Sequence, residues 1–235
     1  MKKLIVASTS TIHGSGYLDY LLDKLTLFFQ FTETILFIPY ARPSGLSHDA
    51  YTEIVQKAFK KIDKNIVGIH QFENPKKALL EAKGIFVGGG NSFVLLDELY
   101  KNDVFDTLKS VIQSGTPYLG TSAGSNICGK TIGTSNDMPI VHPPSFDALS
   151  IIPFNINPHY LDQNPKSKHM GETRETRIKE FHFLNSQSVV GLREGSFLEV
   201  SGERITLKGP LKARIFEYNK EAYEVQPGTD LSLLR

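Results

Sequence analysis

The segment Tyr118-Leu119-Gly120-Thr121-Ser122-Ala123-Gly124 decides the fold that we expect for the rest of the chain. A short apolar run leads into the pattern Gly-x-Ser-x-Gly, which is typical of a tight turn from a strand into a helix. Backbone approaches backbone in such a turn, so the residues around the serine must be small, as Gly120, Ala123 and Gly124 are. The pattern predicts that the Ser122 hydroxyl is presented at the end of a strand. A Gly/Ser-rich loop without chemistry is the alternative interpretation.

Further apolar runs precede this segment. Each is continuous, as in strands buried on both faces of a parallel sheet, and stretches with helical spacing or capping signals lie between them. The expected strands are 4–7, 34–39, 65–70, 85–87 and 117–120, and the expected helices are 17–29, 47–62, 74–84, one from near 92, and 103–115. The alternation predicts an α/β fold with three layers, in which helices cover both faces of a mostly parallel central sheet.

Loops at the carboxyl ends of these strands are expected beside Ser122, because open parallel sheets bind ligands at that edge. The loop Gly88-Gly89-Gly90-Asn91 lacks the spacing of a dinucleotide-binding loop and the Lys-Ser/Thr of a phosphate-binding loop. Its backbone N–H groups and that of Ala123 are candidates for an oxyanion hole. A tight turn that needs glycine conformations is the alternative.

The pattern changes after Ser122. We expect a loop over the site from 131 to 145 and a capped helix from 173 to 184. The later apolar runs are 189–192, 197–200, 205–207, 213–218 and 222–225, with turn residues between them. They predict an antiparallel C-terminal extension of the sheet. Because no repeat, low-complexity segment or linker interrupts the chain, we expect a single domain over residues 1–235.

A serine nucleophile needs a base, usually histidine, and an acid that orients the base. His159 is the favoured base because it follows an apolar run and a proline that fixes its loop, and His142 is the alternative. Asp137, in the loop between Ser122 and His159, and Glu194, at a turn between two expected strands, are the candidate acids. A solvated turn residue is the other interpretation of each acid.

Composition excludes several classes of function. With 26 basic and 25 acidic residues the formal net charge is +1, which argues against general binding to nucleic acid or to a membrane surface. One cysteine, Cys128, excludes an intramolecular disulfide framework and a cysteine-rich metal site. The apolar run at the N-terminus stops at Ser8, which is too short for an export signal, so we expect a cytoplasmic location.

Several segments together resemble the aspartyl dipeptidase (peptidase E) family of serine peptidases. The segments that carry the resemblance are Val87-Gly88-Gly89-Gly90-Asn91, Ser122-Ala123-Gly124, Thr134-Ser135-Asn136-Asp137-Met138-Pro139-Ile140-Val141, Phe146-Asp147-Ala148-Leu149, Ile156-Asn157-Pro158-His159, Gly171-Glu172-Thr173-Arg174 and Glu194-Gly195. Each is weak alone, but their joint occurrence in this order along almost the whole chain is specific. Some members carry tryptophan after the Glu-Gly pair, whereas Ser196-Phe197 follows here.

The resemblance implies a fold similar to class I glutamine amidotransferases, with serine in place of their cysteine. It implies hydrolysis of dipeptides that begin with an unblocked α-linked aspartate. We expect this reaction to need no metal or cofactor, and we expect a monomer or homodimer. Ser122 matches the family's nucleophile and His159 its base. Glu194 and Asp137 both match assigned acids, and Glu194 is preferred because a strand turn holds it more rigidly. Arg174 matches a position near the substrate and is expected to pair with the aspartate carboxylate.

Three other classes of protein share parts of this pattern. An α/β-hydrolase esterase has the same serine turn, but 37 positions between Ser122 and His159 are too few for the rest of that fold. A cyanophycinase-like peptidase would act on a β-linked aspartyl-arginine polymer. A flavodoxin-like binding module would keep the turn without its chemistry.

Overall fold

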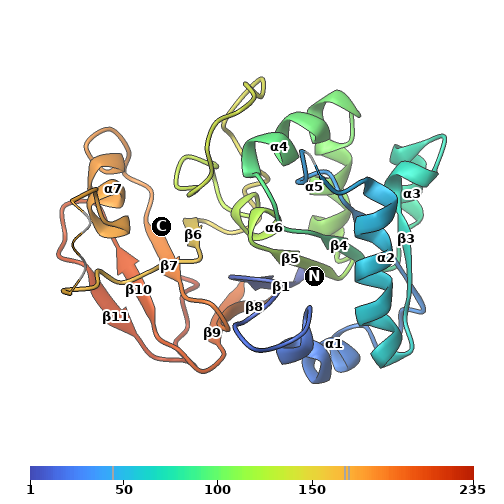
Figure 1. Cartoon of the computed structure of the whole chain (residues 1–235), viewed down its shortest axis with the longest axis horizontal. Helices are drawn as coiled ribbons and strands as arrows, with labels where there is room; N and C mark the ends of the chain where they lie inside the picture. Colours follow the sequence, from blue (N-terminus) through green and yellow to red (C-terminus); the bar gives the residue numbers. More distant parts are fainter. Residues whose placement is uncertain (44, 167, 169) are drawn as a thin grey trace.

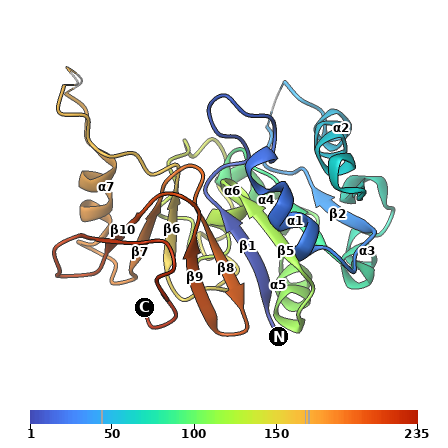
Figure 2. The same ribbon diagram turned by 90° about the horizontal axis from the view of Figure 1, so that it is seen from below.

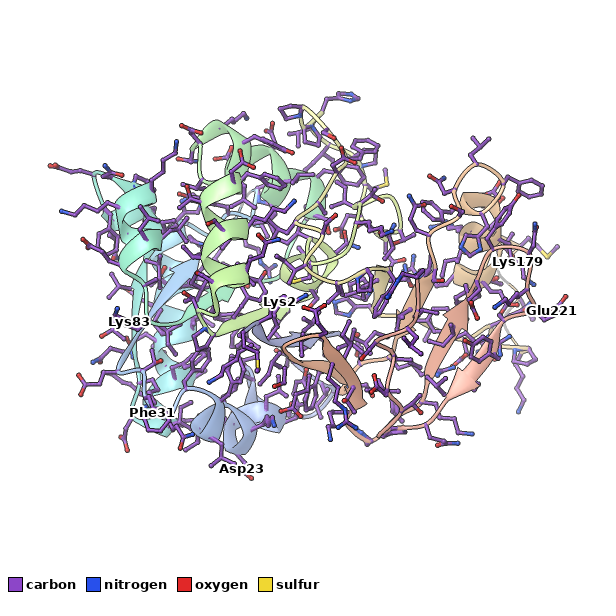
Figure 3. The ribbon with its side chains drawn as sticks, turned by 180° about the vertical axis from the view of Figure 1, so that it is seen from behind. Lys2, Asp23, Phe31, Lys83, Lys179 and Glu221 are labelled. Atoms are coloured by element: carbon purple, nitrogen blue, oxygen red, sulfur yellow. The ribbon has the colours of Figure 1, made fainter. Side chains whose placement is uncertain are left out.

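The computed structural model describes residues 1–43, 45–166, 168 and 170–235, and it contains two sheets that lie side by side along the long axis (Figure 1). The larger sheet and helices α1 to α5 occupy one end, and the smaller sheet and α7 occupy the other. Seen from behind, Lys83 and Phe31 mark the first end and Lys179 and Glu221 mark the second (Figure 3).

The larger sheet has the strand order β3-β2-β4-β5-β1-β8-β9. Its strands are β1 (Lys3–Ala7), β2 (Thr34–Ile38), β3 (Asn65–Gly68), β4 (Ile85–Val87), β5 (Tyr118–Thr121), β8 (Phe197–Ser201) and β9 (Arg204–Lys208). The pairs from β3 to β1 are parallel, and β8 and β9 add antiparallel pairs beyond β1. These pairs confirm the predicted, mostly parallel α/β sheet. Its central strands are continuously apolar because both of their faces are covered.

The helices cover both faces of this sheet. They are α1 (Leu22–Phe28), α2 (His48–Phe59), α3 (Pro75–Glu81), α4 (Ser92–Lys101), α5 (Phe105–Ser114) and α6 (Ala123–Asn126), whereas α7 (Arg174–Phe181) packs against the smaller sheet. Successive side chains of a strand point to opposite faces. Ile5 accordingly packs in a core with α1 and α2, and Leu4 packs in a core with α3 to α6. The predicted three layers are therefore present.

Helices α1 and α2, which follow β1 and β2, cover one face, whereas α4 and α6, which follow β4 and β5, contribute to the opposite core. Strands β2 and β4 are neighbours, and so are β5 and β1. Chains that leave adjacent strands toward opposite faces open a crevice at the carboxyl edge. The turn after β5 lies at this edge.

The predicted antiparallel C-terminal extension is confirmed for β8 and β9, whereas the other C-terminal strands form a second, smaller sheet. Its strand order is β11-β10-β7-β6, built from β6 (Asn155–Pro158), β7 (Val189–Leu192), β10 (Ala213–Phe216) and β11 (Tyr223–Val225). Only β8 and β9 extend the larger sheet, and they lie between β1 and the smaller sheet (Figure 2). Strand β7 pairs in parallel with β6 and antiparallel with β10, so it forms no hairpin with β8. β7 is buried along its whole length, and its pairs with β6 and β10 satisfy the backbone groups on both of its edges.

The predicted helix after residue 173 is confirmed as α7, with Thr173 accepting the Thr176 N–H as its N-cap. Residues of both sheets, such as Val6, Ile38, Val190 and Ile215, share one buried cluster. Among the described residues no helix is long and apolar enough to cross a membrane.

Candidate active site

Ser122 lies in the predicted strand-to-helix turn, between β5 and the single turn of α6. Its backbone has φ 52° and ψ −109°, a conformation that non-glycine residues rarely adopt. The turn is closely packed, since a Cβ on Gly120 would lie 2.5 Å from the Gly124 oxygen and one on Gly124 would lie 2.2 Å from the Val87 oxygen. Glycine is therefore required at both positions. Ser125 braces the turn by donating its hydroxyl hydrogen to the oxygens of Ala7 and Gly120, 2.7 and 2.8 Å away.

His159 follows β6 and reaches the serine. Its Nε2 lies 2.9 Å from Ser122 Oγ. The residue has φ 54°, so its backbone also needs support from its surroundings. The buried hydroxyl of Ser8 supplies it, accepting the His159 N–H at 2.9 Å and donating to the Leu192 oxygen at 2.7 Å. This role of Ser8 could not be predicted from the sequence, where its place after the first strand is the only signal.

Glu194 follows β7 and contacts the other ring nitrogen of His159. Its Oε1 lies 2.6 Å from Nδ1. Strands β6 and β7 are parallel with Pro158 opposite Leu192, so His159 and Glu194 leave neighbouring strands at the same end. The geometry thus joins Ser122, His159 and Glu194 in one hydrogen-bonded chain, the arrangement by which serine hydrolases activate a hydroxyl.

Asp137 lies elsewhere. Its Oδ2 accepts the Ser92 N–H at 2.7 Å and the Ser135 hydroxyl at 2.8 Å. Ser92 is the first residue of α4, so the carboxylate satisfies a backbone donor that a helix leaves without a partner. Asp137 has no hydrogen bond to His159 in the described part of the chain. The structure therefore separates the two candidate acids that the sequence left open.

The glycine loop lies against the nucleophile. A Cβ on Gly89 would lie 3.0 Å from Ser122 Cβ, and one on Gly90, at φ 148°, would lie 2.1 Å from the Ala41 oxygen. The Tyr51 hydroxyl donates to the Gly89 oxygen at 3.2 Å. In a trans peptide the C=O and N–H point in opposite directions, so the Gly90 N–H points away from Tyr51. Ala123 is the first residue of α6, so its N–H has no acceptor within the helix.

Arg174 begins α7 and is half-buried. It has no ion-pair partner within the described ranges. Burial lowers the pKa of Arg174, neighbouring Arg177 lowers it further, and the charge of Asp137 opposes the shift. Asp137 thus lies near enough to act on the guanidinium without pairing with it. Arg174 and Arg177 line an open cavity of about 430 Å³ together with segments 161–165 and 171–173.

His142, the alternative base, lies in the exposed loop after α6 and makes no hydrogen bond within the described residues. The structure brings together Ser122, His159, Glu194 and Gly89 from four segments far apart in sequence. It leaves Asp137 at the start of α4.

This combination of an open α/β sheet, a strained serine turn and a serine–histidine–carboxylate chain defines a class of protein, the serine hydrolases. A family model narrows the class. The model of peptidase family S51 matches residues 4–208, and the chain belongs to this family.

Relatives and solved structures agree with this assignment. The chain is 46% identical to "Peptidase E" of Streptomyces coelicolor, over 98% of this chain and 94% of that protein. It is 43% identical to "Probable alpha-aspartyl dipeptidase" of Drosophila melanogaster, over 99% of this chain and 97% of that protein. A putative peptidase E from Listeria monocytogenes EGD-e has a TM-score of 0.65 at 22% identity, with 90% of this chain and 100% of that chain covered. A peptidase from an acI-B1 Actinobacterium has a TM-score of 0.73 at 16% identity, with 98% and 96% covered. At these identities the two structures show the shared fold.

Proposed function

We propose that this peptidase hydrolyses dipeptides whose first residue is an unblocked, α-linked aspartate, and that Ser122 is its nucleophile. The observation that carries the proposal is the hydrogen-bonded chain from Ser122 through His159 to Glu194. The name of the Drosophila relative, a probable alpha-aspartyl dipeptidase, supports the substrate class.

In this mechanism His159 Nε2 takes the proton from Ser122 as the hydroxyl oxygen attacks the carbonyl carbon of the substrate's first residue. The resulting oxyanion accepts N–H bonds from Ala123 and from Gly89 or Gly90. Losing one such donor costs about 3 kcal/mol of barrier. His159 then gives its proton to the leaving amine, the C–N bond breaks, and water hydrolyses the aspartyl ester of Ser122.

Glu194 is the acid that orients His159 in this proposal. A carboxylate on Nδ1 fixes the ring so that Nε2 faces the serine, and it stabilises the imidazolium that forms. Asp137 takes no part in this relay, because its carboxylate is engaged by Ser92 and Ser135. Its carboxylate binds the first residue of α4, which directly follows the glycine loop, and this contact supports a role of Asp137 in holding that loop.

Arg174 is the residue that we assign to the substrate's aspartate carboxylate. A guanidinium can bind a carboxylate through two parallel N–H bonds. The side chain is half-buried and has no ion-pair partner among the described residues, so an anionic ligand would satisfy it. Partial burial strengthens such a pair, since the surrounding dielectric is lower than in water.

Hydrolysis of a matched peptide panel tests the proposal. The panel contains Asp-Leu, Glu-Leu, Asn-Leu, N-acetyl-Asp-Leu and a β-linked Asp-Arg dipeptide. We expect cleavage of Asp-Leu alone, because both the carboxylate and the free amine are recognised. Cleavage of β-Asp-Arg with Asp-Leu left intact would favour the cyanophycinase-like activity. No cleavage together with no labelling of Ser122 by a phosphonate would favour a binding module.

A further inference from the structure

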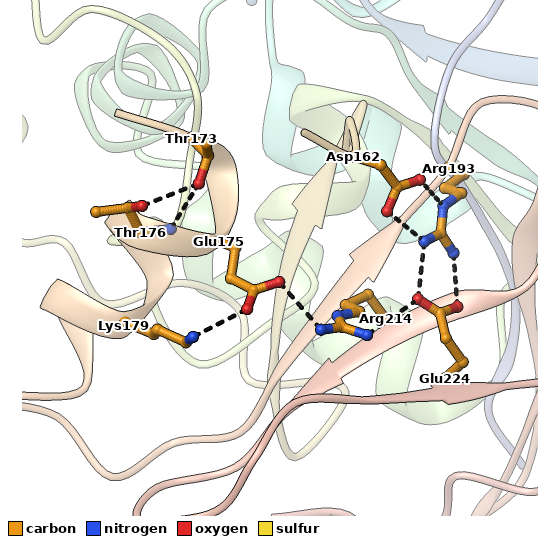
Figure 4. Close-up of polar contacts among 8 residues, drawn as sticks. All are labelled: Asp162, Thr173, Glu175, Thr176, Lys179, Arg193, Arg214 and Glu224. Carbon is orange, nitrogen blue, oxygen red and sulfur yellow. Dashed lines mark hydrogen bonds and ion pairs between the residues drawn. The ribbon is translucent and has the colours of Figure 1, made fainter. Parts of the chain in front are cut away.

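Arg193 lies directly before Glu194, where the chain leaves β7, and its side chain is only 15% exposed. Its guanidinium donates to both oxygens of Asp162 at 2.8 and 2.7 Å, and to both oxygens of Glu224 at 2.9 Å each (Figure 4). A further N–H bond reaches the oxygen of Lys212 at 2.7 Å. A guanidinium has five N–H donors, and all five are used here.

The partner Asp162 is three positions after His159. The regular ladder between β6 and β7 ends at Pro158 opposite Leu192, and one more backbone bond follows, from Tyr160 N–H to the Leu192 oxygen at 3.1 Å. The Arg193–Asp162 pair is the next link between the two segments. It therefore joins the segment that carries His159 to the segment that carries Glu194, just beyond the point where the sheet stops holding them.

Tyr160 packs against Arg193, which with Asp162 and Glu224 forms the group of residues that we call the clamp. The Arg193 guanidinium lies 5.4 Å from the centroid of its ring. On the β7 side the ring packs against Gly191, where a Cβ would lie only 2.7 Å from it. The residue after His159 thus has a fixed ring, with β7 backbone on one side and a guanidinium over its face.

His159 and Glu194 need such support. Their side chains are 37% and 52% exposed, so packing alone does not immobilise them. The positive φ of His159 also has to be held by its neighbours. A misplacement of about 1 Å in a catalytic group can cost about 100-fold in rate. We propose that Arg193 is a positioning residue that sets the distance between His159 and Glu194 by binding the carboxylate of Asp162.

The charges around the clamp make Arg193 difficult to replace. Arg214 binds Glu175 at 3.1 Å and lies 3.6 Å from Glu224, and Lys179 binds Glu175 at 2.9 Å (Figure 4). Glu224 therefore keeps a second cation when Arg193 is lost. Asp162 does not, because Arg193 is its ion-pair partner within the described residues and no other cation pairs with it there. Loss of Arg193 therefore leaves Asp162 without an ion-pair partner among the described residues and removes the side-chain link between its segment and the end of β7.

The test uses the full-length protein and two readouts, since the inference rests on the proposed function. One readout is the rate at which a phosphonate labels Ser122, and the other is kcat and KM for Asp-Leu. For Arg193→Gln we expect labelling and kcat to fall about 100-fold, with KM within about threefold of wild type. Arg193→Lys keeps a positive charge but cannot bind two carboxylates bidentately, so we expect the labelling rate and kcat to fall about tenfold.

Arg204→Gln is the matched control. Arg204 pairs with Asp230 at 3.4 Å on β9 and is 70% exposed, so its loss should leave both readouts within about twofold. Asp162→Asn is the second variant in case Arg193→Gln does not fold, since Asp162 is 60% exposed. We expect it to slow labelling about tenfold, and the double variant to be no slower than Arg193→Gln, because the two changes break one contact.

The outcomes separate the two claims. If the phosphonate fails to label the wild-type protein, the proposed function is overturned, and the proposal for Arg193 with it. Wild-type protein that is labelled, with Arg193→Gln or Asp162→Asn labelled as fast, would overturn the clamp alone. A rise in KM with kcat unchanged in Arg193→Gln would likewise contradict it, because that result assigns Arg193 to substrate binding.

Discussion

The Nδ1 atom of His159 lies 2.6 Å from Oε1 of Glu194, although the two residues are 35 positions apart in sequence. The parallel pairing of β6 with β7 produces this contact, because it brings the ends of both strands to one place. Asp137 instead lies beside the start of α4, where its carboxylate accepts the Ser92 N–H. The two acids therefore make different predictions on mutation.

Glu194→Gln should lower kcat by about 10² to 10⁴-fold, because the amide no longer holds the correct tautomer of His159 or stabilises its charged form. Asp137→Asn, the matched change of one carboxylate to an amide, should lower kcat by no more than about tenfold and cost about 1 kcal/mol of stability at the start of α4. Steady-state kinetics on Asp-Leu and urea unfolding measure both. A larger fall in kcat for Asp137→Asn than for Glu194→Gln would identify Asp137 as the acid that orients His159.

Gly90→Ala should disrupt the loop beside Ser122. The added Cβ would lie 2.1 Å from the Ala41 oxygen, at a φ that side chains rarely adopt, so we expect a loss of at least about 3 kcal/mol or a displaced loop with little activity. Gly14→Ala is the control, since Gly14 also has positive φ but no atom within 4 Å of the added Cβ. It should cost about 1–2 kcal/mol and leave kcat unchanged. Equal effects of the two changes would show that crowding at Gly90 is unimportant.

The Cys128 thiol should be inert in the folded protein. Burial raises the pKa of Cys128 to about 12, so the thiol stays protonated at neutral pH, and only the thiolate reacts readily with alkylating agents. We expect iodoacetamide at pH 8 to leave activity intact, with alkylation appearing only in urea. Inactivation of the native protein that Cys128→Ala prevents would contradict this.

Asp162 should make stability depend on pH in the acid range. The hydrogen bond from Arg193 lowers the pKa of Asp162, so the folded protein binds this proton more weakly than the unfolded chain does. The stabilisation is present above the pKa of Asp162 in the unfolded chain, about 3.9, and it is lost as the pH falls through the lower pKa of Asp162 in the folded protein. The difference in free energy of unfolding between wild type and Asp162→Asn should thus shrink between pH 7 and pH 3. A difference that stays constant would mean that the charge of Asp162 contributes nothing.

Local patterns predicted the features that depend on neighbouring residues. The continuous apolar runs at Leu4–Ala7 and Ile85–Val87 predicted buried parallel strands because such runs have few other stable arrangements. The small residues around Ser122 predicted its strained turn for a similar reason. Proline before His159 and glycine after Glu194 pointed to two ordered turns, which the structure places side by side.

Features that depend on distant pairing were not predictable in this way. The run Val189–Leu192 is equally apolar whether it pairs with β8 or with β6, so its membership of a second sheet was missed. Ser8 and Arg193 are polar residues at strand ends and look like solvated loop residues in sequence. Only the folded arrangement, which brings Ser8 to the His159 backbone and Arg193 to Asp162, gives them a role.

The most direct test of the account is the turnover of Asp-Leu by Ser122→Ala, measured against wild type with equal folded protein confirmed by circular dichroism. We predict that wild type cleaves Asp-Leu and that the variant loses at least about 10⁴-fold in kcat, because among the described residues Ser122 carries the hydroxyl that hydrogen-bonds to the His159 ring. A variant that keeps more than about 1% of wild-type kcat would contradict a covalent mechanism through Ser122.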